Sequence, residues 1–116
     1  MHIEDLRKIC NSLKAVTEDI KWENDLCFCV GDKMFLVVDL NSAPTAASFK
    51  VPDEDFAEIS SRDGFMPAPY VARYKWVMVK DVGLLSRKEW EHFARQAHRL
   101  VYERLPKKMQ KQLGLI

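Results

Sequence analysis

The sequence lacks the motifs of the commonest nucleotide-binding, hydrolase and membrane proteins. No uninterrupted apolar run approaches the roughly 20 residues of a membrane-spanning helix, so we expect no membrane partner. Only four glycines occur in 116 residues, and neither a phosphate-binding loop, a dinucleotide fingerprint nor a G-x-S-x-G turn is present. No nucleophile stands beside a base at motif spacing either. We therefore predict that the chain is not an enzyme.

Cysteine is also scarce, with three residues in all, Cys10, Cys27 and Cys29. Cys27 and Cys29 stand two apart in a predicted strand, so they face the same way and cannot form a relaxed disulfide. No C-x-x-C or H-x-x-x-H pair accompanies them, which favours packing over metal binding and predicts no cofactor. A redox role for one exposed thiol stays an alternative. Reduced thiols and a charged N-terminus without a signal peptide predict a cytoplasmic protein.

Neither sign of charge dominates the sequence. The 18 basic and 17 acidic residues give a net charge of +1, so nothing global favours nucleic acid. The charges are nevertheless segregated, because the segment from Arg95 to Lys111 carries six bases and a single acid, Glu103. This excess indicates an anionic partner. The alternative is that these bases complement the dipole at the C-terminus of a helix and continue into a solvated tail.

The first half of the chain predicts one helix and a β-hairpin. Apolar residues at a spacing of three and four predict a helix over residues 2–14, with a short connector after it. Apolar runs at 26–30 and 34–38 flank Gly31-Asp32. A glycine in the first position of a two-residue loop suits a type II′ turn. We expect the apolar face of this hairpin to carry the helices.

The second half predicts two further strands separated by a short helix. Residues 46–51 alternate as a third strand, and a helix starting at Pro52 is expected to end near Gly64. The alternation of two sets of side chains between opposite faces is clearest over residues 70–79. It predicts one long strand, with Arg73 and Lys75 on the same face.

The last predicted helix begins with a capping box. Ser86 and Glu89 have the spacing at which each satisfies the other's free backbone N–H group. An apolar stripe then continues to Leu105, and Pro106 ends the helix before a basic tail. The resulting order α-β-β-β-α-β-α predicts a single α+β domain over residues 1–116. We expect a two-layer sandwich, an antiparallel sheet with its helices on one face.

Several segments, taken in order, resemble the MmcQ/YjbR family of small bacterial proteins. No single motif is specific, but their succession covers nearly the whole chain. The matching segments are residues 16–22, 30–35, 49–51, 67–70, 75–77, 100–101 and 105–108. The resemblance implies a fold of the frataxin/CyaY type, and it implies no catalytic residues.

The same resemblance implies a role in DNA binding, because the family is often labelled so, with the sheet and its loops as the proposed surface. In this sequence it points to four bases of the hairpin and strands, to which the excess of charge near the C-terminus adds two. The candidate DNA-binding residues are Lys33, Lys50, Arg73, Lys75, Arg95 and Arg99. The partner is then DNA or another polyanion, bound by a monomer.

A second hypothesis is a small-molecule or protein-binding domain with no role on nucleic acid. It rests on the near-zero net charge and on aromatic residues placed to rim a pocket. Those residues are Trp22, Phe65, Tyr70 and Tyr74. An iron-binding role of the frataxin kind ranks third, since it needs a dense acidic ridge and the acids of residues 1–25 are interleaved with bases.

Overall fold

The computed structural model describes residues 2–116. Its helices and strands follow one another in the order α1 (Ile3–Asn11), β1 (Val16–Lys21), β2 (Asp25–Val30), β3 (Lys33–Asp39), β4 (Ala46–Lys50), α2 (Phe56–Ser60), β5 (Phe65–Pro67), β6 (Trp76–Val79), α3 (Arg87–Tyr102) and α4 (Lys107–Gln112). Single turns of 3₁₀ helix occur at Asp53–Asp55, Ala72–Tyr74 and Val82–Leu84.

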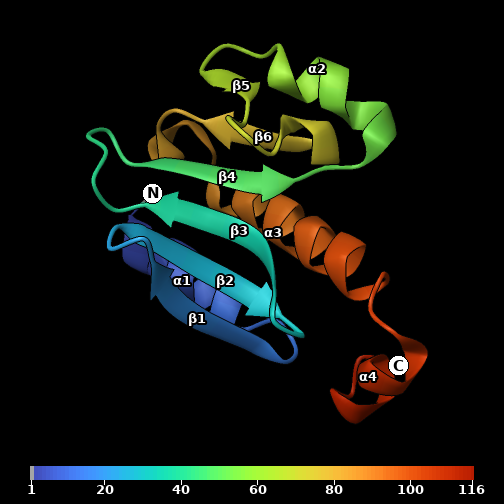
Figure 1. The fold of residues 1–116 in the computed structure, drawn as a ribbon. Coiled ribbons are helices and arrows are strands. Elements are labelled where there is room, and N and C mark those ends of the chain that lie inside the picture. Colours follow the sequence, from blue (N-terminus) through green and yellow to red (C-terminus); the bar gives the residue numbers. More distant parts are fainter. Residues whose placement is uncertain (1) are drawn as a thin grey trace.

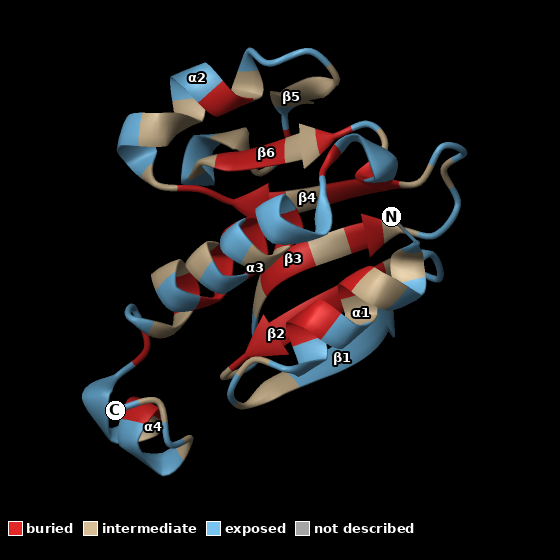
Figure 2. Cartoon of the chain, turned by 180° about the vertical axis from the view of Figure 1, so that it is seen from behind, coloured by how far each residue is buried: buried red, intermediate tan, exposed pale blue. Residues whose placement is uncertain are grey.

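The six strands form one antiparallel sheet with the spatial order β1-β2-β3-β4-β6-β5. Helices α1 and α3 lie together on one face of the sheet, as Figures 1 and 2 show from opposite sides. Within residues 2–116, the opposite face carries no helix, and α2 lies beside β5 and β6 at one end. The predicted α+β architecture, an antiparallel sheet with helices packed on it, is confirmed. The structure adds two strands and one helix to the predicted order.

The core fills the space between the sheet and helices α1 and α3. Trp90 of α3 is completely buried, and its indole N–H donates a hydrogen bond of 2.9 Å to the carbonyl of Val82. Its ring meets Phe49 of β4 edge-on, with 5.5 Å between the ring centroids. The capping box of Ser86 and Glu89 is present at the start of α3, as predicted.

Strand β1 was not predicted, because residues 15–25 were expected to form a connector. Its residues pair with β2 from Val16 opposite Val30 to Lys21 opposite Asp25. As an edge strand with four exposed residues in the middle, it lacks the apolar alternation by which half-buried strands are recognised. Arg7 of α1 holds it in place through an ion pair of 2.6 Å with Glu18.

The prediction of one long strand over residues 70–79 was wrong. Only Trp76–Val79 form strand β6. Tyr70 and Lys75 have backbone φ angles of 69° and 65°, and this left-handed conformation interrupts a β-ladder. Arg73 therefore lies in a 3₁₀ turn rather than on a strand. The three-residue strand β5, which pairs with β6, was missed because it is too short to show a period.

Two smaller predictions also need correction. Gly31 and Asp32 both have positive φ angles, 57° and 65°, which define a type I′ turn rather than type II′.

The basic tail after Pro106 forms helix α4. It is anchored by the buried side chain of Gln110, whose amide nitrogen donates a 2.7 Å hydrogen bond to the carbonyl of Leu105. None of the helices in residues 2–116 has the length and apolar character needed to cross a membrane.

Candidate functional site

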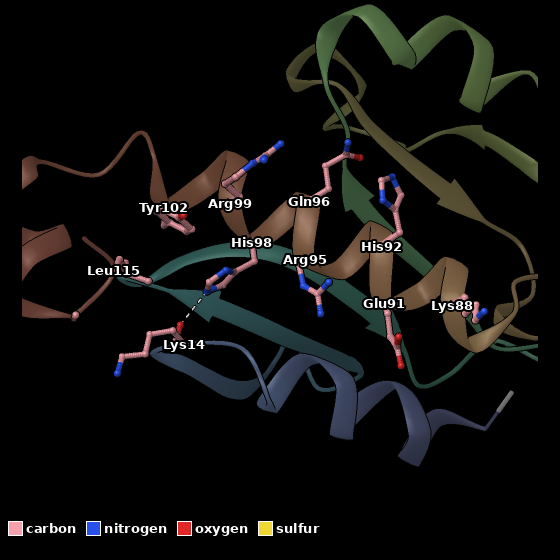
Figure 3. A pocket seen from close by; sticks show the side chains of 11 residues that line it. Lys14, Lys88, Glu91, His92, Arg95, Gln96, His98, Arg99, Tyr102 and Leu115 are labelled. Carbon is pink, nitrogen blue, oxygen red and sulfur yellow. Dashed lines mark hydrogen bonds between the residues drawn. The ribbon is translucent and has the colours of Figure 1, made fainter.

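A cavity of about 810 Å³ runs along the outer side of α3 (Figure 3). It lies between α3, the end of α1 and the C-terminal residues, and we call it the α3 groove. Its lining contains four bases and one acid. The lining residues are Lys14, Lys88, Glu91, His92, Arg95, Gln96, His98, Arg99, Tyr102, Gly114 and Leu115. The groove is therefore electropositive, although the whole chain is nearly neutral.

The spacing along α3 explains why three of these bases share one side of the helix. Lys88, Arg95 and Arg99 stand at positions i, i+7 and i+11, which nearly superpose at 3.6 residues per turn. All three side chains are exposed. From this shared side their side chains diverge, and Figure 3 shows Arg99 extending toward one flank of the helix and Arg95 toward the other. With a rise of 1.5 Å per residue, the three bases cover roughly 16 Å of helix.

Most of these charges have no acidic partner. Arg99 lies 3.5 Å from Glu103, one turn further along the exposed surface of α3, and such exposed pairs are weak. For Lys14, Lys88 and Arg95, no carboxylate of residues 2–116 comes within 4 Å. In the free protein these three charged groups are hydrated by solvent, and a bound anion can replace that water.

The base of the groove is neutral and holds two polar groups. The ring of His98 is buried and its Nε2 atom lies 2.8 Å from the carbonyl oxygen of Lys14 (Figure 3). Burial lowers the pKa of His98 more than this hydrogen bond raises it, so the ring is uncharged at neutral pH. The side-chain oxygen of Gln96 is buried without a hydrogen-bond partner among residues 2–116. A ligand that donates a hydrogen bond would satisfy it.

Three of the predicted DNA-binding residues lie elsewhere, at the ends of β4 and β6. Lys50 is only 9% exposed, and its ammonium group donates a 2.6 Å hydrogen bond to the carbonyl of Tyr74. The guanidinium group of Arg73 lies over the ring of Tyr74, 4.7 Å from its centroid. The ammonium group of Lys75 lies 5.2 Å from the ring centroid of Phe56.

The charge of Lys50 is affected by burial and by neighbouring bases. Burial lowers the pKa of Lys50, and the nearby charges of Arg104 and Lys75 lower it further. The charged groups of Lys50, Arg73 and Lys75 each make a contact within the protein. Lys33 stands exposed at the start of β3, next to the hairpin turn. The six predicted residues therefore do not form one surface, and only Arg95 and Arg99 line the α3 groove.

Sequence reasoning missed two bases of the groove. Lys88 had a detectable signal, since it precedes Arg95 by seven residues on the same predicted helix. Lys14 had none, because it reaches the groove only through the packing of α1 against α3. Of the four predicted aromatic residues, Trp22 and Tyr70 line another cavity, on the helix-free face of the sheet, whereas Phe65 and Tyr74 do not.

The cysteines are three buried free thiols. Burial raises the pKa of Cys10 to about 12 and that of Cys27 to about 11. A thiol of this kind is almost never a thiolate at neutral pH, which makes it unreactive. Among residues 2–116, no group of three or more His, Cys, Asp or Glu side chains is placed to hold a metal ion.

Comparisons with known proteins agree with this fold. A protein of Deinococcus radiodurans with a DUF419 domain has a crystal structure that is similar with a TM-score of 0.86 at 25% identity, over 97% of this chain and 87% of that one. A Pseudomonas syringae protein shares the fold, with a TM-score of 0.70 at 17% identity over 86% of this chain and 98% of that one. No curated protein matches the sequence. The YjbR family model matches residues 11–100, so the chain belongs to the YjbR family.

Proposed function

We propose that this protein is a non-enzymatic binding module for DNA or another polyanion, and that the α3 groove holds the phosphates. The observation that carries the proposal is the set of four bases, Lys14, Lys88, Arg95 and Arg99, around one cavity with a single acid. Affinity for nucleic acid comes largely from such bases, because each phosphate that is neutralised releases condensed counterions.

The extent of the groove suits a backbone better than a single anion. Lys88 and Arg99 are separated by roughly 16 Å along α3, whereas successive phosphates of one DNA strand follow at about 3.4 Å of helix axis. A chain of phosphates can therefore meet all four bases in turn, which a single small anion cannot do. The bases at the ends of β4 and β6 serve less well, since Lys50 is buried.

A salt series tests the proposal directly. Fluorescence anisotropy of labelled duplex and single-stranded DNA should show binding that weakens steeply with ionic strength. For three to four neutralised phosphates, the affinity for duplex falls about 40- to 150-fold between roughly 50 and 200 mM salt. If neither duplex nor single-stranded DNA binds at the lower salt concentration, the proposal is wrong.

Variants locate the binding site. Arg95→Ala combined with Arg99→Ala should lower the slope of log affinity against log salt by about two. Arg73→Ala combined with Lys75→Ala tests the alternative site near Tyr74. Lys80→Ala is the matched control, because Lys80 is exposed and belongs to neither group. A groove variant that binds DNA like the wild type would contradict the assignment of the groove.

A further inference from the structure

A second cavity, of about 360 Å³, lies on the helix-free face of the sheet. Val37 of β3 and Ser48 of β4, which are cross-strand neighbours, line it together with three aromatic residues. Trp22 comes from the loop between β1 and β2, Tyr70 from the loop between β5 and β6, and Trp76 from the start of β6. We call this cavity the aromatic cleft. It is separate from the α3 groove, because the two cavities share no lining residue and α3 packs on the other face of the sheet (Figure 1).

Two of the aromatic residues are held in costly conformations without being buried. Trp22 is 70% exposed and Tyr70 is 98% exposed, and both have positive φ angles, 51° and 69°. The left-handed region is unfavourable for bulky L-residues. Hairpin turns such as the one at Trp22 and Glu23 require positive φ angles, but they do not require a bulky aromatic residue there. Core packing gains little from rings that remain in water, so packing does not explain the choice of these side chains, and strained positions of this kind cluster at ligand-binding sites.

The cleft is acidic at the end near Trp22. Asp25 lines it and stands directly opposite Asp39 in the β2–β3 ladder, an arrangement in which like charges repel. Lys21 faces Asp25 from β1, and Asp19 lies on the same face, opposite Cys27. Three carboxylates thus stand against one ammonium group. Burial raises the pKa of Asp25, and the nearby charge of Asp39 raises it further.

Aromatic walls next to a carboxylate attract a cation, because the face of each ring carries negative potential. A primary ammonium ion is strongly hydrated and loses three hydrogen bonds to water on entry. The cleft offers few acceptors in return, chiefly the Asp25 carboxylate and the Ser48 hydroxyl group. An alkylated ammonium group has no such requirement, and the cavity volume lies at the lower end for small-molecule sites.

We propose that the aromatic cleft binds a small organic cation with an alkylated ammonium head, held by the rings of Trp22, Tyr70 and Trp76 and by the Asp25 carboxylate. Phosphate-bearing ligands are disfavoured there by the same carboxylates. This inference goes beyond the proposed binding of polyanions, because it concerns another face of the molecule and a ligand of opposite charge.

The test compares choline chloride with its neutral isostere 3,3-dimethylbutan-1-ol on the full chain. NMR spectra record the indole N–H signals of the three tryptophans. Choline should shift the signals of Trp22 and Trp76, while the signal of Trp90, which is buried and bonded to Val82, should stay in place. With so few atoms in choline, saturation is expected in the range of about 1–10 mM. The isostere should bind at least about tenfold more weakly, since it lacks the cation–π attraction.

Three variants assign the roles of the lining residues. Trp22→Ala and Tyr70→Ala should each weaken choline binding about two- to fivefold through loss of an exposed ring face. Asp25→Asn keeps the shape of the side chain and should narrow the preference for choline over the isostere. Tyr74→Ala is the matched control, because Tyr74 is an exposed tyrosine outside the cleft. The NMR spectrum of each variant shows whether it is folded.

Several outcomes would overturn the inference. Equal affinity for choline and the isostere would make the cleft a site for neutral apolar ligands. Signals of Trp22 and Trp76 that move on dilution without any ligand would assign the cleft to a second copy of the chain. The absence of any shift with choline up to about 50 mM, well above the expected saturation, would exclude the cationic ligand altogether.

Discussion

The Nε2 atom of His98 lies 2.8 Å from the main-chain oxygen of Lys14. Because a carbonyl oxygen only accepts hydrogen bonds, the ring carries its proton on Nε2 and donates it. The contact joins α3 to the segment after α1 across 84 residues of sequence, and it brings Lys14 to the α3 groove.

The first prediction concerns the pH dependence of stability. His98 has a lowered pKa in the folded state, with burial as the main cause, while in the unfolded chain it titrates near 6.5. As the pH falls below about 6.5, the unfolded state therefore binds more protons than the folded state. The contribution of neutral His98 to the free energy of unfolding is complete above this pH and is lost progressively on acidification. Urea unfolding at pH 7.5 and at pH 5.5 measures the loss. His98→Gln should reduce it, whereas the exposed control His92→Gln should not.

The second prediction concerns the turn between β2 and β3. Gly31 has a φ angle of 57°, and a Cβ atom there would lie 2.6 Å from Cδ1 of Leu105 and 3.0 Å from the sulfur of Met109. Gly31→Ala should therefore lower the free energy of unfolding by about 2 kcal/mol, through backbone strain and crowding. Asp32→Gly, next to it in the same turn, is the control and should cost less than about 1 kcal/mol. Urea denaturation of the two variants and the wild type measures both changes in the free energy of unfolding.

The third prediction separates Lys50 from the groove. Its ammonium group already donates to the carbonyl of Tyr74 at 2.6 Å and is largely buried, so it has little capacity to contact a phosphate. Lys50→Met should leave the salt dependence of DNA binding within the error of the wild type. Arg95→Ala should lower the slope of log affinity against log salt by about one. A clear loss of slope in Lys50→Met would show that the end of β4 contacts the phosphates.

The fourth prediction concerns thiol reactivity. Cys10, Cys27 and Cys29 are buried, and burial raises the pKa of all three. Little thiolate is therefore present at pH 8, and access is blocked as well. Ellman's reagent should modify the native protein at least about 100-fold more slowly than the urea-unfolded protein, in which thiols titrate near 8.5. One thiol that reacts quickly in the native state would restore the redox alternative.

Much of the fold is readable from local pattern. The apolar stripe and capping box predict α3, and the two apolar runs around Gly31-Asp32 predict the central hairpin, because each of these elements buries one complete face. Strand β1 escaped prediction for the opposite reason: it is an edge strand whose middle residues are exposed. The alternation over residues 70–79 was misleading, since Tyr70 and Lys75 adopt φ angles that no periodicity reveals.

The candidate sites also combine features that the sequence predicts with features that it does not. The helical spacing of Lys88, Arg95 and Arg99 places three bases on one side of α3, and this follows from the sequence alone. Lys14 joins them only because α1 packs against α3, and Trp22 meets Tyr70 only because the loops of β1–β2 and β5–β6 reach the same cavity. The helix faces and the central strands follow from the sequence alone, because the spacing of apolar residues along one segment is enough to predict which face that segment buries. Which distant side chains share a groove or cleft was decided by tertiary packing, because contacts between residues far apart in the chain depend on strand order and register.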